Sequence, residues 1–226
     1  MAHTKRYAHL LTPLRYFPQS AGIILTLMVS GVMVLAPPAL GQELSVHEGT
    51  ILLRIARDTL SEYLNRQTTP KLSSYEVTER LSQKRGVFVT LKDRHTAELR
   101  GCIGYTEGYK TLAEAVIDCT VYAATRDIRF RPLRAGEEKE VVIEISVLSP
   151  LQPVSTIEQI RVGVHGLVLT NGLKTGVLLP QVPLEQHWSR DEFLRALCRK
   201  ADLPDRAWEH GGQLFAFTAQ IFSERH

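Results

Sequence analysis

The sequence is poor in cysteine and lacks the spacings that usually mark metal sites. Only Cys102, Cys119 and Cys198 occur in 226 residues, and such a small and odd set does not resemble a disulfide framework. No Cys-x-x-Cys or His-Glu-x-x-His pair is present, and the eight histidines are scattered. A dedicated zinc or iron site is therefore not expected, and the sequence predicts neither a metal ion nor a cofactor.

Motifs that hold nucleotides or activate a serine are also missing. The chain has no phosphate-binding loop, no Gly-x-Gly-x-x-Gly and no Gly-x-Ser-x-Gly, which removes the commonest nucleotide-binding and serine-hydrolase signatures. The formal net charge is only +3 and no stripe of aromatic and basic residues is present, so a nucleic-acid partner is disfavoured. The chain is 44% hydrophobic, which is enough to bury one good core.

The first forty residues differ in kind from the rest. Three basic residues are followed by an uncharged apolar stretch over 21–36, two prolines and the small-residue exit Ala39-Leu40-Gly41. This order is typical of a secretory signal peptide. We therefore predict a signal peptide over 1–41 and an exported mature chain, periplasmic or extracellular, that begins at Gln42. An uncleaved membrane anchor and a cytoplasmic protein with a wrongly set start are the alternatives.

Capping patterns and hydrophobic periodicity predict a mixture of helices and hairpins. Capping boxes begin helices after Ser45 and Ser189. Two more helices are expected over 77–84 and 108–126, strands over 87–91, 141–148 and 215–221, a hairpin over 166–179, and an extended exit from it over 180–183. Tight hairpins imply antiparallel pairing, so the predicted fold class is α+β, with a mainly antiparallel sheet flanked by helices.

Cys102 differs from the other two cysteines in its local sequence. Cys119 and Cys198 lie on the apolar stripes of predicted helices and are expected in the core. Cys102 follows a polar turn and stands between Gly101 and Gly104. Glycine is used where the backbone turns sharply or approaches another group closely, so we expect Cys102 where a strand breaks, as an accessible thiol. A small buried residue in a tight strand end is the competing interpretation.

At this point the chain resembles a known family. The motif Leu99-Arg100-Gly101-Cys102-Ile103-Gly104 is similar to the signature of the AMMECR-type domain, also called AmmeMemoRadiSam system protein A. Further blocks that match in order lie over 122–132, 143–150, 163–167 with 178–182 and, more weakly, 198–204. The resemblance runs from about residue 45 to the end, and it implies one AMMECR-type domain over 42–226.

The resemblance implies more about the fold than about the activity. It suggests a main sheet flanked by helices with a smaller lobe packed on it, and a cleft between the lobes that takes the Cys102 loop. The family has no settled activity. Its members are often encoded beside Memo-like and radical-SAM proteins, so these are the partners that the resemblance implies, and any metal chemistry would belong to them.

Two groups of polar residues are candidates for a site around the cysteine. Asp127 and Arg129 follow a predicted helix, where Arg129 could hold an anion that Asp127 helps to fix, although arginines also simply stabilise helix ends. The predicted strand over 141–148 is apolar on both faces except at Glu144 and Ser146, so it is expected at the centre of the sheet. Glu144 and Ser146 share one face of it. A buried carboxylate there needs a partner, for which an arginine is expected; the alternative is a face that meets solvent.

Three classes of function remain open. In the first, a thiol-dependent enzyme uses Cys102, with Arg100 or Arg129 lowering its pKa and His165 or Glu144 as base. A lone histidine such as His165 is, however, more often structural. In the second, the domain is a binding module for an unknown small molecule or protein. The ligand-binding residues would then be Gly101, Gly104, Asp127, Arg129, Glu144, Ser146 and Gln181. In the third, disfavoured by charge, it binds nucleic acid. A membrane is a partner only if the N-terminal segment stays uncleaved.

Overall fold

The computed structural model describes residues 43–225, so the predicted signal peptide over 1–41 lies outside the described residues. These residues divide into two compact units. We call residues 43–150 together with 218–225 the terminal unit, and Leu151–Phe217 the inserted unit. Each unit is described by itself below.

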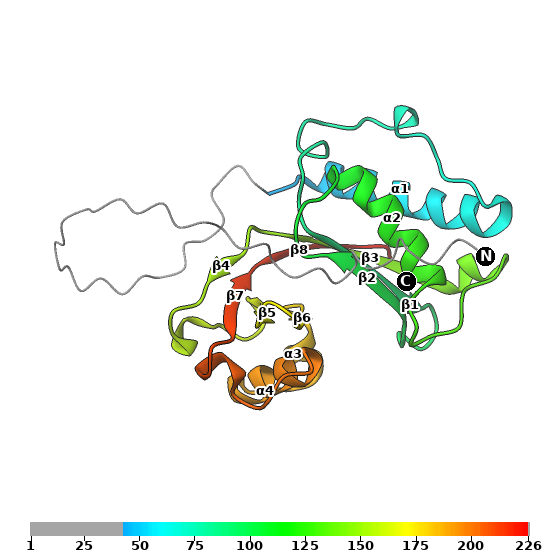
Figure 1. Cartoon of the computed structure of the whole chain (residues 1–226). Helices are drawn as coiled ribbons and strands as arrows, with labels where there is room; N and C mark the ends of the chain where they lie inside the picture. Colours follow the sequence, from blue (N-terminus) through cyan, green and yellow to red (C-terminus); the bar gives the residue numbers. More distant parts are fainter. Residues whose placement is uncertain (1–42, 226) are drawn as a thin grey trace, which may run out of the picture. The chain divides into compact units, whose positions relative to one another are not determined.

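The terminal unit is an antiparallel sheet with two long helices (Figure 1). Its elements are α1 (Val46–Arg66), the 3₁₀ turn η2 (Leu72–Ser74), β1 (Val87–Asp93), β2 (Leu99–Tyr105), α2 (Leu112–Thr125), η3 (Glu137–Glu140), β3 (Val141–Leu148) and β8 (Ala219–Ser223). The strand order is β2-β1-β3-β8, and every neighbouring pair is antiparallel. The prediction that the strand over 141–148 is central is confirmed, because β3 lies between β1 and β8.

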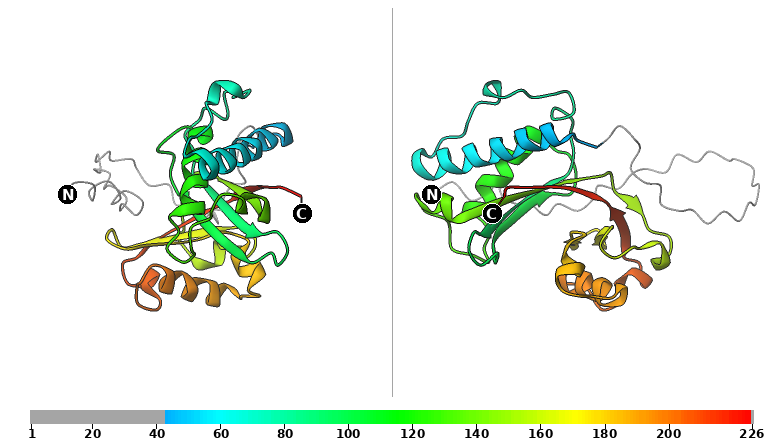
Figure 2. Two further views of the ribbon diagram at one scale, coloured as in Figure 1. Left: turned by 90° about the vertical axis from the view of Figure 1, so that its right-hand side faces the viewer. Right: turned by 180° about the vertical axis from the view of Figure 1, so that it is seen from behind.

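Strand periodicity separates the two faces of this sheet. On the first face, the alternate residues Val87, Val89 and Leu91 of β1 are fully buried in one cluster with residues of α1 and α2. Both helices lie on this face (Figures 1 and 2). The intervening residues of β1, among them Thr90 and Lys92, point to the opposite face, because successive side chains of a strand alternate. The helix-free face of the sheet is therefore the more polar one.

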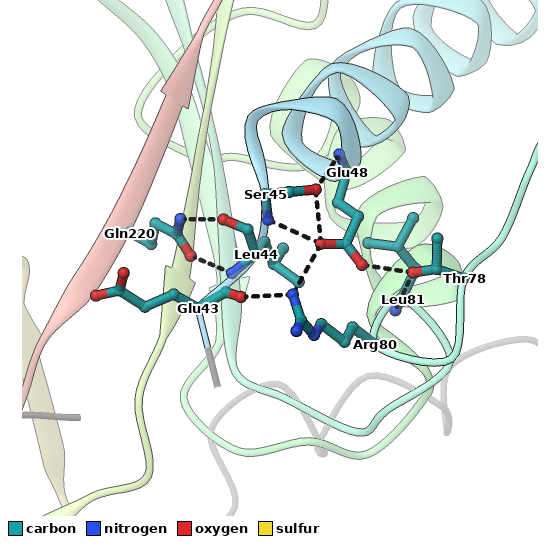
Figure 3. A network of polar contacts seen from close by, with 8 residues as sticks. All are labelled: Glu43, Leu44, Ser45, Glu48, Thr78, Arg80, Leu81 and Gln220. Atoms are coloured by element: carbon teal, nitrogen blue, oxygen red, sulfur yellow. Dashed lines mark hydrogen bonds and ion pairs between the residues drawn. The ribbon is translucent and has the colours of Figure 1, made fainter. Parts of the chain in front are cut away.

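The start of α1 is held by a network around one carboxylate (Figure 3). Ser45 is the N-cap, and the predicted capping box is present, with the Glu48 carboxylate accepting from the Ser45 amide at 2.8 Å. Glu48 also accepts from the Thr78 hydroxyl at 2.7 Å and pairs with Arg80 at 3.5 Å. One carboxylate thus caps a helix and tethers a loop 30 residues further along the chain.

The end of the chain is tied to the same unit by a second ion pair. Glu224, just beyond β8, accepts from Arg57 Nε of α1 at 2.8 Å and from the Ile143 amide of β3 at 2.9 Å. The two side chains of the pair are 27% and 19% exposed, so solvent screens the pair only partly. The last residues therefore join α1 to β3.

The inserted unit is a second antiparallel sheet with its own core (Figure 2). Its elements are β4 (Gln152–Pro153), η4 (Ile157–Gln159), β5 (Gly166–Thr170), β6 (Thr175–Leu178), α3 (Val182–Glu185), α4 (Arg190–Lys200), η5 (Ala207–Glu209) and β7 (Gln213–Phe217), in the strand order β4-β7-β5-β6. The apolar face of α4, including Phe193 and Leu197, packs in one cluster with Leu167 and Leu169 of β5. The predicted capping box at Ser189 and the predicted hairpin are confirmed.

Three predicted elements are wrong in detail. The expected helix over 77–84 is a series of turns, because the Leu81 and Gln83 carbonyls accept from amides at the start of α2 instead of from amides further along a helix of their own. The segment 180–183 is not extended, because α3 begins there with Pro183 in its first turn, a position that proline tolerates. The expected strand over 215–221 is two strands, β7 and β8, in different sheets.

The predicted fold class is confirmed as α+β, since both sheets are antiparallel and helices accompany each of them. Among the helices of residues 43–225, none combines the length and the apolar character that a membrane span requires.

Candidate functional site

Cys102 lies within strand β2, not at a break in it, so the expected strand end is wrong. The glycines beside it serve close packing. A Cβ atom on Gly101 would stand 2.2 Å from the Ala123 carbonyl oxygen of α2, and one on Gly104 would stand 2.3 Å from the Phe88 ring. Glycine is needed where backbone approaches this closely. The motif therefore brings β2 against α2 and leaves Cys102 half-buried.

The Cys102 thiol has a hydroxyl partner on the neighbouring strand. Cys102 stands opposite Thr90 in the β1–β2 ladder. The Thr90 hydroxyl donates to Cys102 Sγ at 3.4 Å. Thr90 is only 6% exposed, so the bond is shielded from competing water. A donor aimed at sulfur favours the thiolate over the neutral thiol.

A carboxylate lies next to Thr90 on the third strand of the sheet, β3. Glu144 of β3 stands opposite Thr90, and residues directly opposite in an antiparallel pair share a face. The Glu144 carboxylate accepts from Lys92 Nζ at 3.2 Å, with side-chain exposures of 14% and 25%. A lysine of β1 is therefore a partner of Glu144, where an arginine was expected. Cys102, Thr90, Glu144 and Lys92 together are called the polar row.

Ser146, the next residue of β3 on this face, stands opposite Phe88 and is fully buried. The prediction that Glu144 and Ser146 share a face is confirmed by the register of β1 and β3. Ser146 thus lies beside the polar row, one step along the strand from Glu144.

Both backbone groups of Cys102 are held by side chains from the turn after α2. Strand β2 is an edge of the sheet, which leaves its outer N–H and C=O groups without a strand partner. The Cys102 amide donates to Asp127 Oδ2 at 2.9 Å, and Arg129 Nη2 donates to the Cys102 carbonyl at 3.2 Å. We call Asp127 and Arg129 the edge clamp, because they fix the peptide that carries the thiol.

The edge clamp is itself an ion pair. Arg129 donates to Asp127 through Nε at 2.9 Å and through Nη2 at 2.6 Å. Burial acts to raise the pKa of the Asp127 carboxyl, but the bonds from Arg129 and from the Cys102 amide outweigh it, so this pKa lies below its usual value. Asp127 is therefore an anion at neutral pH. It also holds Arg129 beside Cys102.

The Arg100 side chain bonds to the turn after α2. A β-bulge falls between Leu91 and Lys92 in the β1–β2 register, and Arg100 is the extra residue. Bulges interrupt the two-residue alternation of a strand. Arg100 therefore need not share a face with Cys102, although the two are two residues apart. The Arg100 guanidinium instead donates through Nη1 to the Arg131 carbonyl at 2.8 Å. Arg129 is thus the arginine that contacts the Cys102 residue.

The other two cysteines are core residues, as predicted. Cys119 is fully buried on α2 and Cys198 is 1% exposed on α4. Burial raises the pKa of both thiols, since a thiolate is poorly stabilised away from water. All three cysteines fall within residues 43–225, and no disulfide joins them there.

His165 and Gln181 belong to the inserted unit, whereas the polar row and the edge clamp belong to the terminal unit. His165 is 4% exposed, and its Nδ1 accepts from the Arg161 amide at 3.2 Å. Burial, assisted by the Arg161 charge, lowers the pKa of this imidazole. A neutral histidine that closes a turn in this way is explained by its structural role alone. Gln181 lies directly before α3.

Sequence reasoning missed Thr90 and Lys92. Their signal was available in the alternation of β1, which places both on the face opposite Val89 and Leu91. What was missing was the register between β1 and β2, because the bulge at Arg100 shifts it. Within residues 43–225, no group of three or more histidine, cysteine, aspartate or glutamate side chains is placed to hold a metal ion.

Comparison with known proteins identifies relatives along most of the chain. The AMMECR1 family model matches residues 53–222. Protein MK0488 of Methanopyrus kandleri is 42% identical over 193 residues, which cover 82% of this chain and 92% of the relative. Protein MJ0810 of Methanocaldococcus jannaschii is 39% identical over 188 residues, covering 80% and 92% respectively. The crystal structure of the uncharacterized protein PH0010 from Pyrococcus horikoshii superposes with a TM-score of 0.78 at 36% identity, covering 81% of this chain and 94% of that one. The chain therefore belongs to the AMMECR1 family.

Proposed function

We propose that this AMMECR1-family domain is a thiol-dependent enzyme whose nucleophile is Cys102. The observation that carries the proposal is the 3.4 Å hydrogen bond from the Thr90 hydroxyl to Cys102 Sγ. Nucleophilic cysteines act as thiolates and need a group that stabilises the anion or accepts the proton. Cys102 has such a donor and is half-buried, whereas Cys119 and Cys198 are buried in the cores of the two units.

The polar row supplies a route for the thiol proton. Thr90 stands between Cys102 and Glu144 in register. In the proposed relay its hydroxyl oxygen accepts the thiol proton and releases its own proton to the carboxylate, after which the hydroxyl donates to Sγ. Lys92 holds the Glu144 carboxylate in place on this face of the sheet, next to Thr90 in the register. Of the two bases considered from the sequence, we assign the role to Glu144.

The edge clamp gives the proposed enzyme a binding group for substrate. Arg129 remains 44% exposed although Asp127, with 4% exposure, occupies two of its nitrogens. Its exposed edge can bind a carboxylate or phosphate of the substrate next to the thiol. In the reaction, Sγ forms a bond to a carbonyl carbon of that substrate, the π electron pair of the C=O bond moves to the carbonyl oxygen, and the thiol proton passes by way of Thr90 to Glu144.

The second candidate is a binding module without chemistry. The same fixed and exposed Arg129 favours it, since an arginine held by a buried carboxylate is a prepared anion site even if the thiol is inert. For either function, Memo-like and radical-SAM proteins are the partners that we propose, and family membership is the support for them.

Alkylation by iodoacetamide as a function of pH tests the enzyme proposal. We expect wild-type Cys102 to be alkylated in the folded protein and Cys102→Ser to lose that label. Thr90→Val keeps the shape but removes the donor, and it should move the alkylation profile to higher pH by about one unit, the equivalent of one hydrogen bond. Thr50→Val on the exposed side of α1 is the matched control, because Thr50 bonds only within its own helix.

A thiol that reacts only when urea unfolds the protein would rule out the enzyme and leave the binding module. The urea midpoint of each variant is measured alongside, so that loss of label and loss of fold are distinguished.

A further inference from the structure

We infer that the turn after α2 is a docking surface for an acidic segment of a partner protein. The surface, here called the arginine turn, comprises residues 126–134. Its tip is Ile128, whose side chain is 100% exposed. A fully exposed isoleucine contributes nothing to the core, so its whole side chain is available to contact a partner.

The arginine turn presents Ile128 rigidly. The Phe130 amide donates to the Asp127 carbonyl at 3.1 Å, and the Arg129 amide donates to Asp127 Oδ1 at 3.2 Å. At the far end, the Leu133 amide donates to the Ala124 carbonyl of α2 at 2.8 Å. A segment that is already ordered loses little conformational entropy when it binds, so this tip is prepared for a partner.

The charges of the arginine turn are directed outward. The segment holds four arginines and no lysine in nine residues. Two of these arginines form ion pairs, and in each pair the carboxylate is less exposed than the arginine. Asp127 is 4% exposed and its partner Arg129 is 44% exposed; Glu137 is 27% exposed and its partner Arg131 is 60% exposed. The surface that a partner meets is therefore positive, which selects an acidic segment by charge complementarity.

The composition favours a protein over a nucleic acid. Arginine is enriched at protein interfaces and lysine is depleted. An isoleucine at the tip adds nothing to contacts with phosphates. The one aromatic ring in the segment, Phe130, has the Arg129 guanidinium over it, 5.4 Å from its centroid, which leaves that face unavailable for stacking on a base. The expected occupant is an acidic peptide segment with at least one large apolar side chain.

This surface can be tested without disturbing the edge clamp. Ile128→Ser removes the apolar tip, and Arg134→Gln removes one charge; neither side chain bonds to Cys102, which is held by Asp127 and Arg129. Leu173→Ser is the matched control for the tip, since Leu173 is 86% exposed but lies in the β5–β6 hairpin of the inserted unit. Arg66→Gln, at the end of α1, is the control for charge.

The probe is a random dodecapeptide library displayed on phage and selected on the folded protein. Selected peptides are then synthesised with a fluorescent label and measured by anisotropy at low and high salt. We expect them to be rich in aspartate and glutamate around an apolar residue. Their affinity should fall about tenfold in Ile128→Ser and about threefold in Arg134→Gln, and should not change in either control.

Three results would overturn the proposal. The first is a library that yields no saturable peptide, and the second is peptides whose affinity is the same for Ile128→Ser as for wild type. The third is a labelled single-stranded oligonucleotide that binds more tightly than the selected peptides and is equally sensitive to Arg134→Gln. Circular dichroism of both variants confirms that the fold is kept, so an effect on binding is assigned to the surface.

Discussion

The side-chain amide of Gln220 makes both backbone hydrogen bonds of Leu44. The Leu44 amide donates to Gln220 Oε1 at 2.8 Å, and Gln220 Nε2 donates to the Leu44 carbonyl at 2.6 Å (Figure 3). The two residues are 176 positions apart in sequence, and Leu44 is only 4% exposed. The side-chain amide of Gln220, in β8, thus takes the place that a backbone peptide group of a neighbouring strand would have beside Leu44, just before α1.

Replacing Gln220 with alanine should lower the free energy of unfolding by about 2 kcal/mol, because it leaves two backbone groups of a buried residue without partners. The measurement is the urea midpoint, with the slope of the transition checked for constancy. Gln213→Ala, on an exposed position of β7, is the control and should change stability by less than about 0.5 kcal/mol. Equal midpoints for the two variants would show that the amide pairing is not needed.

Acid should destabilise the protein through Glu48. Burial acts to raise the pKa of its carboxyl, but the bonds from Thr78 and Ser45 and the charge of Arg80 outweigh it, so the folded-state pKa lies below the ordinary 4.5. Because the shift is downward, the stabilisation is fully present above pH 4.5 and is lost as the pH falls through the folded-state pKa.

We therefore expect Glu48→Gln to cost about 2 kcal/mol at neutral pH and progressively less relative to wild type as the solution becomes acidic. Urea titrations at several pH values measure this. Glu43→Gln is the control, since only the Glu43 backbone carbonyl joins the network. A Glu48→Gln deficit that stays constant from neutral to acidic pH would contradict the assignment.

Adding one methyl group at Gly101 should destabilise the terminal unit by about 3 kcal/mol or prevent folding, because the new Cβ would stand 2.2 Å from the Ala123 carbonyl oxygen. Gly136→Ala is the comparison. Gly136 has a φ of +92° but nothing within 4 Å of a built Cβ, so only the backbone strain of about 1 kcal/mol is expected. Thermal midpoints measure this difference. If Gly101→Ala unfolds at a higher temperature than Gly136→Ala, then β2 can move away from α2.

Export remains a prediction from the N-terminal sequence. We expect the mature chain to begin at Gln42 and to be recovered from a periplasmic or culture-medium fraction. N-terminal sequencing of the recovered protein is the measurement. Soluble protein that begins at Met1 and stays in the cytosol would contradict the prediction.

Local signals in the sequence identified local structure well. The capping boxes at Ser45 and Ser189 are present, because they depend on residues three apart. The central position of β3 followed from apolar residues on both of its faces. Such features are decided by neighbours in the chain and do not need knowledge of the partner element.

The errors arise where a distant partner decides the structure. Glu144 meets Lys92 through the register between β1 and β3, and Cys102 meets Thr90 through the register between β1 and β2, in which Arg100 is a bulged residue. The alternation from Phe215 to Ile221 continues without interruption although β7 ends at Phe217. Thr218, between the two strands, bonds to Ser149 at the end of β3: its amide donates to the Ser149 hydroxyl at 2.9 Å. Periodicity carries no information about which sheet a strand joins.

The position of β8 in the sequence has a consequence for how the protein is made. Residues 219–223 supply the fourth strand of the terminal sheet, and all of Leu151–Phe217 is synthesised between β3 and that strand. While the chain emerges from the ribosome, the outer edge of β3 therefore has no neighbouring strand until β8 has been synthesised. The inserted unit, which is contiguous in sequence, can fold during that interval. The terminal sheet can be completed only after the whole inserted unit has been synthesised and β8 has followed it.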